Sequence, residues 1–428
     1  MTEIKAFNGT RYNNIIIDIA KVVAPPYDVI NETQQDEFYK MHPYNVIRLI
    51  LGKQHEDDNE NNNRYTRAKR FIDEWKEKGI LIRDDEPAIY LYVQKYKIGN
   101  KNYERRGFIA LMRLDSDIYK HEKTLSKPKE DRFELMKACN SNLSPIFVLY
   151  DDKKKCVECI TINPKIHIPI AHLKDGEVEH FFYKVPDKKI ISIITDMIGK
   201  QRVYIADGHH RYETALKYRD YMFSKYGKDD DADYNYVMSY FTNMSDDGLV
   251  ILPTHRVVHN IKYRDEELLD KLKAGFSIKQ FLAAPDKNKI EQWLSEIGKN
   301  NKGFGVKFYD SDKLYILYDY KPFNLKKDNS SDVLKSLDVY ILNKEILEHI
   351  FDIGEVDLSR GEKLSYFHNI NEALNSMING DVIFVLNPPS AMDVKSVALA
   401  SLTMPQKTTF FYPKLLSGLV FNFFNIKQ

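Results

Sequence analysis

The chain has 428 residues, 43% of them hydrophobic and 29% charged, a composition typical of a globular protein with two or three domains. Its 63 Lys and Arg residues nearly balance its 62 Asp and Glu residues, which argues against attraction of the whole protein to nucleic acid. It contains neither an apolar run long enough to span a membrane nor a signal-peptide pattern, so we expect a cytoplasmic protein without a membrane partner.

The cysteines are few and odd in number, which is typical of a protein in a reducing compartment. They are Cys139, Cys156 and Cys159. Cys156 and Cys159 form a C-x-x-C motif, but no second pair accompanies them, and a structural zinc site needs four ligands. The motif therefore does not by itself predict a zinc or redox site.

Hydrophobic patterns predict the first elements of the chain. Residues 15–23 are an apolar run that predicts a strand, and Pro25-Pro26 then holds the backbone extended, which leaves Asp28 on a constrained loop. A helix is predicted from Asn31 to about residue 40, and a buried strand is predicted at residues 46–51.

Clearer patterns follow. Residues 64–78 have the apolar spacing of an amphipathic helix that ends at Gly79. Residues 88–97 and 104–113 flank the turn sequence Gly99-Asn100 and predict a β-hairpin. A helix that leads into a strand at residues 146–150 and a helix at residues 190–198 are also predicted.

A charged block begins at residue 121. Its candidate site residues, with two that follow the helix, are His121, Glu122, Lys123, Thr124, Lys127, Asp131, Arg132, Asn142 and Ser144. A run of charges is often only the solvated face of a helix. The alternative is a binding site for an anion, and the charge pattern alone leaves both open.

The stretch RVYIADGHHRYETAL at residues 202–216 is the most informative. Its apolar start predicts a strand at residues 202–206, Asp207-Gly208 is a turn signal, and the later spacing predicts a helix up to Gly227. Asp207 is either an N-cap or a site residue, and Gly208 serves either a positive φ angle or a ligand.

Three residues at the start of that helix point to an anion. His209, His210 and Arg211 lie in the first helical turn, where unpaired N–H groups and the helix dipole favour negative charge. Cationic side chains there oppose the dipole and need a compensating anion. The unit of strand, turn and helix therefore predicts a phosphate site.

The rest of the chain predicts further strands and a change of domain. Strands are expected at residues 236–244 and 249–252, after which Thr254, His255 and Arg256 follow on a loop at a strand end. The alternative is that this loop has no site role and that His255 only caps a neighbouring element. Lys- and Glu-rich helices begin after residue 260, so we predict a catalytic region at 1–260 and a C-terminal region at 261–428 that contributes to the site.

The C-terminal region contains a predicted helix at residues 338–352 and a buried strand at 382–386. Its closing block, residues 404–421, is rich in aromatic residues, which predicts that it is part of the hydrophobic core. Lys407, Thr408 and Lys414 within this block are candidates for contact with an anion.

Ala-Asp-Gly-His-His-Arg-Tyr-Glu-Thr-Ala at residues 206–215 resembles the signature of an uncharacterised prokaryotic family, domain of unknown function one-thousand-and-fifteen. Pro-Pro-Tyr-Asp-Val, His-Glu-Lys-Thr, Pro-Lys-Glu-Asp-Arg, Asn-Leu-Ser-Pro-Ile and Pro-Gln-Lys are similar to other blocks of that family, in the same order. The five-residue core Asp-Gly-His-His-Arg also resembles the phosphate-binding turn of the ParB/sulfiredoxin fold, which includes free-serine kinases.

The resemblance implies a mixed α+β fold, with a ParB/sulfiredoxin-like core and a C-terminal α+β domain. It also favours a site role for the Asp28 loop and for the charged block. Family members often lie beside serine-biosynthesis genes, which implies serine or phosphoserine as the substrate.

The function expected is phosphoryl transfer on a small metabolite, because cations, donors and carboxylates are what this reaction needs. Gly208, His209, His210 and Arg211 would bind phosphate, Asp28 or Glu122 would be the base, and Asp207 would orient the turn. A free-serine kinase and a phosphoserine phosphatase fit equally, with ADP or ATP and Mg²⁺ as expected cofactors. Which residues would hold a metal ion is open, as is the oligomeric state, with a homodimer as one option.

Two other functions remain as alternatives. One is a ParB-like regulatory protein that binds nucleotide or DNA, and the other is a metal-dependent nuclease. Standard P-loop and protein-kinase motifs are absent from the sequence. If the enzyme reading holds, residues 121–132, 207–211 and 254–256 should line one cleft.

The net charge generates a first prediction. With a formal charge of +1, the protein neutralises few phosphates, so binding to DNA should be weak and should disappear at physiological salt. A gel-shift titration at low and physiological salt measures this. A salt-resistant, sequence-specific shift would instead favour the ParB-like alternative.

Overall fold

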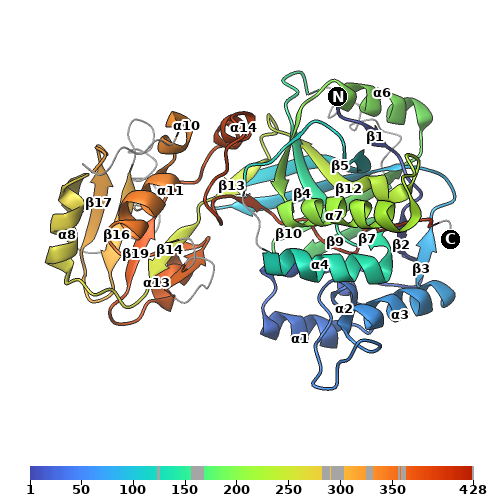
Figure 1. The fold of residues 1–428 in the computed structure, drawn as a ribbon, viewed down its shortest axis with the longest axis horizontal. Coiled ribbons are helices and arrows are strands. Elements are labelled where there is room, and N and C mark those ends of the chain that lie inside the picture. Colours follow the sequence, from blue (N-terminus) through green and yellow to red (C-terminus); the bar gives the residue numbers. More distant parts are fainter. Residues whose placement is uncertain are drawn as a thin grey trace. The chain divides into compact units, whose positions relative to one another are not determined.

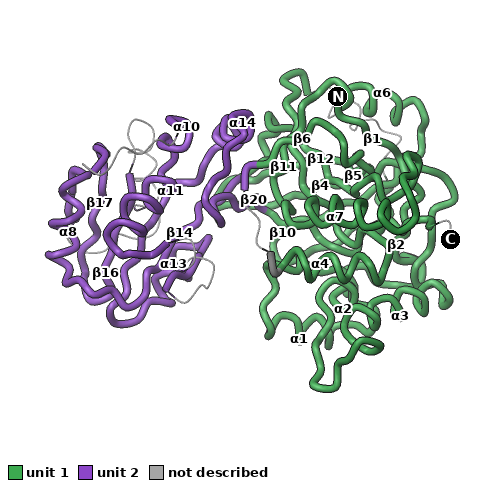
Figure 2. The backbone as a smooth tube through the Cα atoms, viewed as in Figure 1, with its two compact units in different colours: residues 1–120, 124–250, 413–428 green, residues 121–123, 251–412 purple. Residues whose placement is uncertain are grey.

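The computed structural model describes residues 1–122, 126–155, 168–281, 290, 303–323, 331–354, 357 and 363–426, with the backbone alone at 126 and 127. The described chain forms two compact units (Figure 2). Unit 1 comprises residues 1–120, 124–250 and 413–428, and unit 2 comprises residues 121–123 and 251–412. Apart from residues 121–123, the chain leaves unit 1 after Val250 and returns to it at Pro413.

A nine-stranded mixed sheet forms the centre of the described part of unit 1 (Figure 1). In spatial order its strands are β6 (Ile118–Tyr119), β11 (Val203–Asp207), β8 (Ile146–Tyr150), β12 (Tyr236–Asn243), β5 (Lys101–Arg113), β4 (Ile89–Ile98), β10 (Val178–Val185) and β9 (Ala171–Asp175), with β1 (Ile4–Lys5) paired to β5. The β11–β6 and β12–β8 pairs are parallel, and the others are antiparallel. The β4–β5 hairpin turns at Gly99-Asn100, as predicted.

Helices and short strands complete unit 1. They are η1 (Ile19–Lys21), η2 (Tyr27–Val29), α1 (Glu32–Met41), α2 (Ile47–Ile50), α3 (Arg64–Glu77), α4 (Ser126–Cys139), α6 (Lys188–Gly199), α7 (His209–Tyr226) and η4 (Asp233–Asn235), with the pairs β2 (Thr10–Tyr12) to β3 (Leu81–Arg83) and β7 (Ser141–Asn142) to β21 (Asn422–Phe423). Helices α4 and α7 lie side by side (Figure 1).

The two faces of the central sheet have different surroundings because side chains alternate along a strand. Phe108, Ala110 and Met112 of β5 point into an apolar core that α6 and α7 cover with residues such as Ile194 and Ala215. The opposite face of β5 carries Arg105. A second core packs α2, α3 and α4 around Trp75.

Unit 2 contains a six-stranded antiparallel sheet in its described part. Its strands, in spatial order, are β15 (Ser277–Phe281), β17 (Leu314–Tyr318), β16 (Phe304–Phe308), β19 (Val382–Val385), β14 (His255–Val258) and β18 (Leu364–Phe367). A short ribbon pairs β13 (Val250–Leu252) with β20 (Phe410–Tyr412). The helices are α8 (Asp265–Lys273), α10 (Asp332–Lys335), α11 (Asp338–Ile341), the π-helix η5 (Leu342–Glu348), α13 (Ile370–Ser376) and α14 (Ala391–Leu399).

The mixed α+β class predicted from sequence is confirmed, and so are most of the long elements. The strands predicted for two short apolar runs are wrong. Residues 15–23 contain the 3-10 helix η1, which Asp18 caps at the amide of Ala20. Residues 46–51 contain helix α2, whose start is held by the Asn45 side chain at the amide of Ile47. Both runs are short, and short apolar runs have no periodicity that separates a strand from a helix.

Two predictions in unit 2 also differ from the structure. The predicted loop at residues 254–256 is largely strand β14, which is hydrogen-bonded between β18 and β19 and therefore has no freedom to form a loop. The helix predicted at 338–352 begins at Asp338 but widens into the π-helix η5. Its apolar face is buried all the same, through residues such as Val339 and Ile346.

The unit limits lie close to the predicted boundary at residue 260 but do not coincide with it. The sheet of unit 2 already begins with β14, before residue 260. Residues 413–426 pack with unit 1, because Phe421 is part of the core around Trp75 and β21 pairs with β7. Among the residues that the structure describes, no helix has the length and apolar character needed to cross a membrane.

The tight packing of β5 against β12 generates a stability prediction. A Cβ atom at Gly107 would collide with the Phe241 carbonyl and the Tyr240 ring, so Gly107→Ala should destabilise unit 1 by about 1–3 kcal/mol. The matched control is Gly199→Ala, where the nearest atom beyond the helix is the Thr2 carbonyl at 3.6 Å. Urea unfolding of both variants measures the difference, and equal stabilities would contradict the described packing.

Candidate phosphate site in unit 1

The strand, turn and helix predicted from sequence are present, and Gly208 is the pivot between them. β11 ends at Asp207, Gly208 has φ 89°, and α7 begins at His209. The positive φ predicted for Gly208 is therefore confirmed. The N-cap interpretation of Asp207 is wrong, because Gly208 occupies the N-cap position without a side-chain cap.

Gly208 also leaves room for Arg211. A Cβ atom at Gly208 would lie 3.0 Å from the Arg211 guanidinium, which folds back over the turn. The guanidinium donates to the carbonyl of Pro145, and one of its nitrogens is 3.8 Å from an Asp207 oxygen. The Arg211 side chain is only 13% exposed. A glycine at this position therefore serves both the turn and the arginine.

Asp207 is held mainly by a residue from the far end of the chain. The Lys414 ammonium donates to Asp207 Oδ2 at 2.9 Å. Burial disfavours the charged carboxylate, but Lys414 and Arg211 outweigh it and hold the pKa of Asp207 well below its ordinary value. Asp207 is therefore ionised at neutral pH.

Arg132 is the second arginine of the site, and it is buried. Its Nε and Nη2 atoms donate to Asp131, and Nη1 donates to the Ile50 carbonyl at 2.6 Å. Asp131 also accepts from Arg64 and from Tyr65. Burial opposes the charge of Asp131, but these partners lower its pKa. The Asp131–Arg132 pair on α4 is thus held in place by Arg64, Tyr65 and the Ile50 carbonyl.

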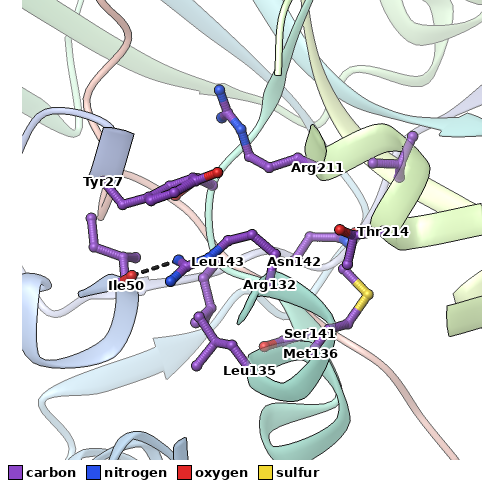
Figure 3. A pocket seen from close by; sticks show the side chains of 12 residues that line it. Tyr27, Ile50, Arg132, Leu135, Met136, Ser141, Asn142, Leu143, Arg211 and Thr214 are labelled. Carbon is purple, nitrogen blue, oxygen red and sulfur yellow. Dashed lines mark hydrogen bonds between the residues drawn. The ribbon is translucent and has the colours of Figure 1, made fainter. Parts of the chain in front are cut away.

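Arg132 and Arg211 line one cavity of about 50 Å³, shown in Figure 3. The remaining lining residues are Tyr27, Ile50, Leu135, Met136, Ser141, Asn142, Leu143, Ser144, Thr214 and Val237. All of them belong to unit 1. The cavity is thus lined by two arginines, together with residues that carry hydroxyl and amide groups.

Tyr27 is a cavity residue that sequence reasoning missed. The Arg132 guanidinium lies over its ring, 4.0 Å from the ring centroid. Burial raises the pKa of Tyr27 to about 12, although Arg132 counteracts it, so the phenol stays protonated and can donate a hydrogen bond. Its place in the Pro-Pro-Tyr-Asp-Val block was the available signal, but only the neighbouring carboxylate was selected there.

Other predicted site residues of unit 1 have different positions. Asp28 is exposed on η2, next to Tyr27, whereas His209 is buried and His210 is half-buried. Asn142 accepts from the Met238 amide, and the Ser144 hydroxyl is 2.7 Å from that of Ser417. Asn142 and Ser144 line the cavity, and their role in binding stays a prediction.

The remaining predicted residues fall in unit 2 or outside the described residues. Lys123, Thr124 and the side chain of Lys127 lie outside, as do Cys156 and Cys159. In unit 2, His121 Nε2 is 3.4 Å from Thr409 Oγ1, and the Lys407 amide donates to Glu122 at 3.4 Å.

The β14 residues of unit 2 are deeply buried. Thr254 contacts His368, and His255 accepts from the Leu386 amide. Arg256 donates to the carbonyls of Thr254 and Lys407, and burial lowers its pKa to about 10. Thr408, also buried, donates to the Pro405 carbonyl. One common cleft for the blocks of both units stays a prediction.

Within the described ranges, no group of three or more His, Cys, Asp or Glu side chains is arranged to hold a metal ion.

The low pKa of Asp207 generates a prediction about acid stability. A carboxylate with a lowered pKa contributes stability that is present above its unfolded value, 3.8, and is lost as the pH falls towards the folded value. Asp207→Asn should therefore lower the free energy of unfolding at pH 7 by roughly 1.5–3 kcal/mol, and this deficit should shrink as the pH falls below about 4. Urea unfolding across this pH range measures it. Asp73→Asn, which removes an exposed carboxylate paired with Lys69, is the control and should show almost no deficit. A deficit of the same size at every pH would contradict the assignment.

Comparisons with known proteins identify the family. The model of a family described as "Protein of unknown function (DUF1015)" matches residues 4–340. No curated protein matches the chain. The solved structures that resemble it include a conserved hypothetical protein from Pyrococcus furiosus, with 14% identity, a TM-score of 0.34, and coverage of 72% of this chain and 92% of that one.

Two further structures are similar at the same level. A free serine kinase mutant in complex with ADP is 15% identical, with a TM-score of 0.35, and 71% of this chain and 87% of that chain are covered. SbnI with a C-terminal truncation, from Staphylococcus aureus, is 13% identical, with a TM-score of 0.32 and coverage of 74% and 83%. At such TM-scores these likenesses carry no conclusion about ligand or activity. The family match covers most of the chain, and the protein therefore belongs to the DUF1015 family.

Proposed function

We propose that this protein is a phosphoryl-transfer enzyme that acts on a small metabolite, with serine or phosphoserine as the substrate. The observation that carries the proposal is that two arginines, the buried Arg132 and the partly buried Arg211, line the cavity in unit 1. Guanidinium groups bind phosphate oxygens through charge-assisted hydrogen bonds, often two at a time.

The charges around the cavity support an anionic ligand. Four cations, Arg64, Arg132, Arg211 and Lys414, belong to the ion pairs of Asp131 and Asp207. With the exposed carboxylate of Asp28 included, these groups carry four positive and three negative charges, a net charge of +1. The first turn of α7 adds the positive end of the helix dipole.

The size of the cavity supports a small group as the occupant. Its volume of about 50 Å³ is far below the roughly 300 Å³ at which pockets for whole small molecules begin. A phosphoryl group is the right size, whereas a complete nucleotide is not. In this proposal the cavity holds the phosphate, and the rest of the substrate lies outside it.

The neutral groups of the wall have matching roles. The phenol of Tyr27 and the hydroxyls of Ser144 and Thr214 can donate to phosphate oxygens, and the amide of Asn142 can do the same. Asp28, exposed beside Tyr27, is the proposed base for the substrate hydroxyl. Glu122, in unit 2, is the other proposed base.

Serine is the proposed substrate because of the family resemblance rather than the geometry. Members of the family often lie beside serine-biosynthesis genes, and the Asp-Gly-His-His-Arg core resembles that of free-serine kinases. ADP or ATP, with Mg²⁺, would be the phosphoryl carrier of a kinase. A phosphoserine phosphatase would use the same cavity, with water as the acceptor.

The Arg211 guanidinium generates the test of this proposal. Arg211→Ala removes a charge-assisted phosphate contact of roughly 1.5–3 kcal/mol, so the affinity for O-phospho-L-serine should fall at least tenfold. Calorimetric titration measures the affinity, and thermal unfolding with and without O-phospho-L-serine and ADP measures the ligand-induced shift.

The matched control is Arg219→Ala. Arg219 lies on the same helix but pairs with Asp115 and Asp220 at the surface, so its loss should leave the affinity unchanged. A variant Arg211→Ala that melts several degrees lower while the ligand-induced shift keeps its wild-type size would show that Arg211 only holds the fold.

A further inference from the structure

The segment that returns from unit 2, residues 413–417, touches several parts of the phosphate site. We call it the return segment. Its Lys414 binds Asp207, and its Ser417 hydroxyl is 2.7 Å from that of Ser144 in the cavity wall. The backbone of Ser417 also exchanges two hydrogen bonds with Ala24, just before the Pro-Pro-Tyr sequence that ends in Tyr27.

Buried polar side chains of the central sheet hold the return segment in place. Arg105, which is fully buried, donates to the Pro413 carbonyl and to Gln94. Gln94 in turn donates to the Lys414 carbonyl at 3.0 Å. The Leu416 amide donates to the hydroxyl of Tyr92 at 3.3 Å. The backbone on both sides of the Lys414 side chain is therefore fixed.

Asp207 interacts more closely with one of its two neighbouring cations than with the other. Its Oδ2 accepts from Lys414 at 2.9 Å, whereas its Oδ1 is 3.8 Å from Arg211, beyond ordinary hydrogen-bond length. Lys414 does not line the cavity, but Arg211 does. The carboxylate is thus engaged by the cation that lies away from the cavity.

We propose that Lys414 is a positioning residue of the phosphate site, which engages Asp207 so that the charge of Arg211 remains available to an anion in the cavity. This inference rests on the proposed function. Without Lys414, Asp207 would be left with Arg211 as its partner, and a close pair of the two would cancel the charge that attracts the ligand. Lys414 therefore acts on the ligand through Asp207 and Arg211, without contact.

The role of Lys414 predicts an unusual pattern among charge variants. Lys414→Met should lower the affinity for O-phospho-L-serine and for inorganic phosphate about tenfold or more. Asp207→Asn should bind both at least as tightly as the wild type, because it removes the competing carboxylate. The double variant Asp207→Asn/Lys414→Met should recover the affinity to within about threefold of the wild type, since Lys414 then has no carboxylate to engage.

The control is Lys217→Met, which removes one positive charge from α7 at a residue that pairs with Glu130 on the surface. It reports the effect of a lost charge without a change at Asp207, and its affinity should stay near the wild-type value. Lys414→Arg keeps a cation beside Asp207 and should retain most of the affinity. It also covers the case in which Lys414→Met does not fold, which circular dichroism reveals.

The experiment is calorimetric titration of the full chain and these variants with both probes. Wild-type affinity in Lys414→Met, or failure of Asp207→Asn to restore the affinity of Lys414→Met, would overturn the role of Lys414 while leaving the phosphate site intact. Failure of the proposed function has a different signature: the wild type would bind neither probe, or Arg211→Ala would bind both as the wild type does.

Discussion

A buried guanidinium cannot shed its proton, so the protein around it must supply hydrogen-bond acceptors. This constraint governs unit 1, where Arg105, Arg132 and Arg211 are all largely withdrawn from water. Arg105 donates to a carbonyl and an amide oxygen, Arg132 donates to a carboxylate and a carbonyl, and Arg211 donates to one carbonyl. Arg211 differs from the other two because its neighbouring carboxylate, Asp207, is 3.8 Å away, beyond ordinary hydrogen-bond length.

The residues that come near these arginines arrive from distant parts of the chain. Lys414 and Asp207 are 207 positions apart, and Arg105 and Pro413 are 308 positions apart. Such contacts hold the edge of β11, the start of α7 and the closing segment in one arrangement. The site is therefore a product of the whole topology of unit 1, and no element of it is complete alone.

The sequence predicted best what depends on local chemistry. Gly208 and Gly227 bound helix α7 as expected, because a positive φ and a helix stop are properties of adjacent residues. The long hairpin around Gly99 was predictable for the same reason. Helix α2, in place of the strand expected at residues 46–51, was not predictable, because a short buried apolar run has no periodicity that separates strand from helix.

Within the site, the sequence predicts several of the cavity-lining residues but not the contacts that these residues make with distant parts of the chain. Arg132, Arg211, Asn142 and Ser144 were selected and do line one cavity. Tyr27 is not among the predicted site residues, although it precedes Asp28 in the Pro-Pro-Tyr-Asp-Val block, and Lys414 is predicted only as a direct contact for an anion. No local pattern marks a lysine whose partner is a carboxylate on another strand, so this relation needed coordinates.

The interruption of unit 1 by unit 2 has a consequence for synthesis on the ribosome. Domains usually begin to fold as soon as their residues emerge, from the N-terminus onward. Here the central sheet of unit 1 is fully translated by Asn243, yet Lys414 and the strand β21 emerge only after the whole of unit 2. A nascent chain must therefore carry an unfinished site, with Asp207 still lacking its ammonium partner, while some 160 further residues are added. In the proposed function, unit 1 can therefore bind its anion fully only after the return segment has been translated.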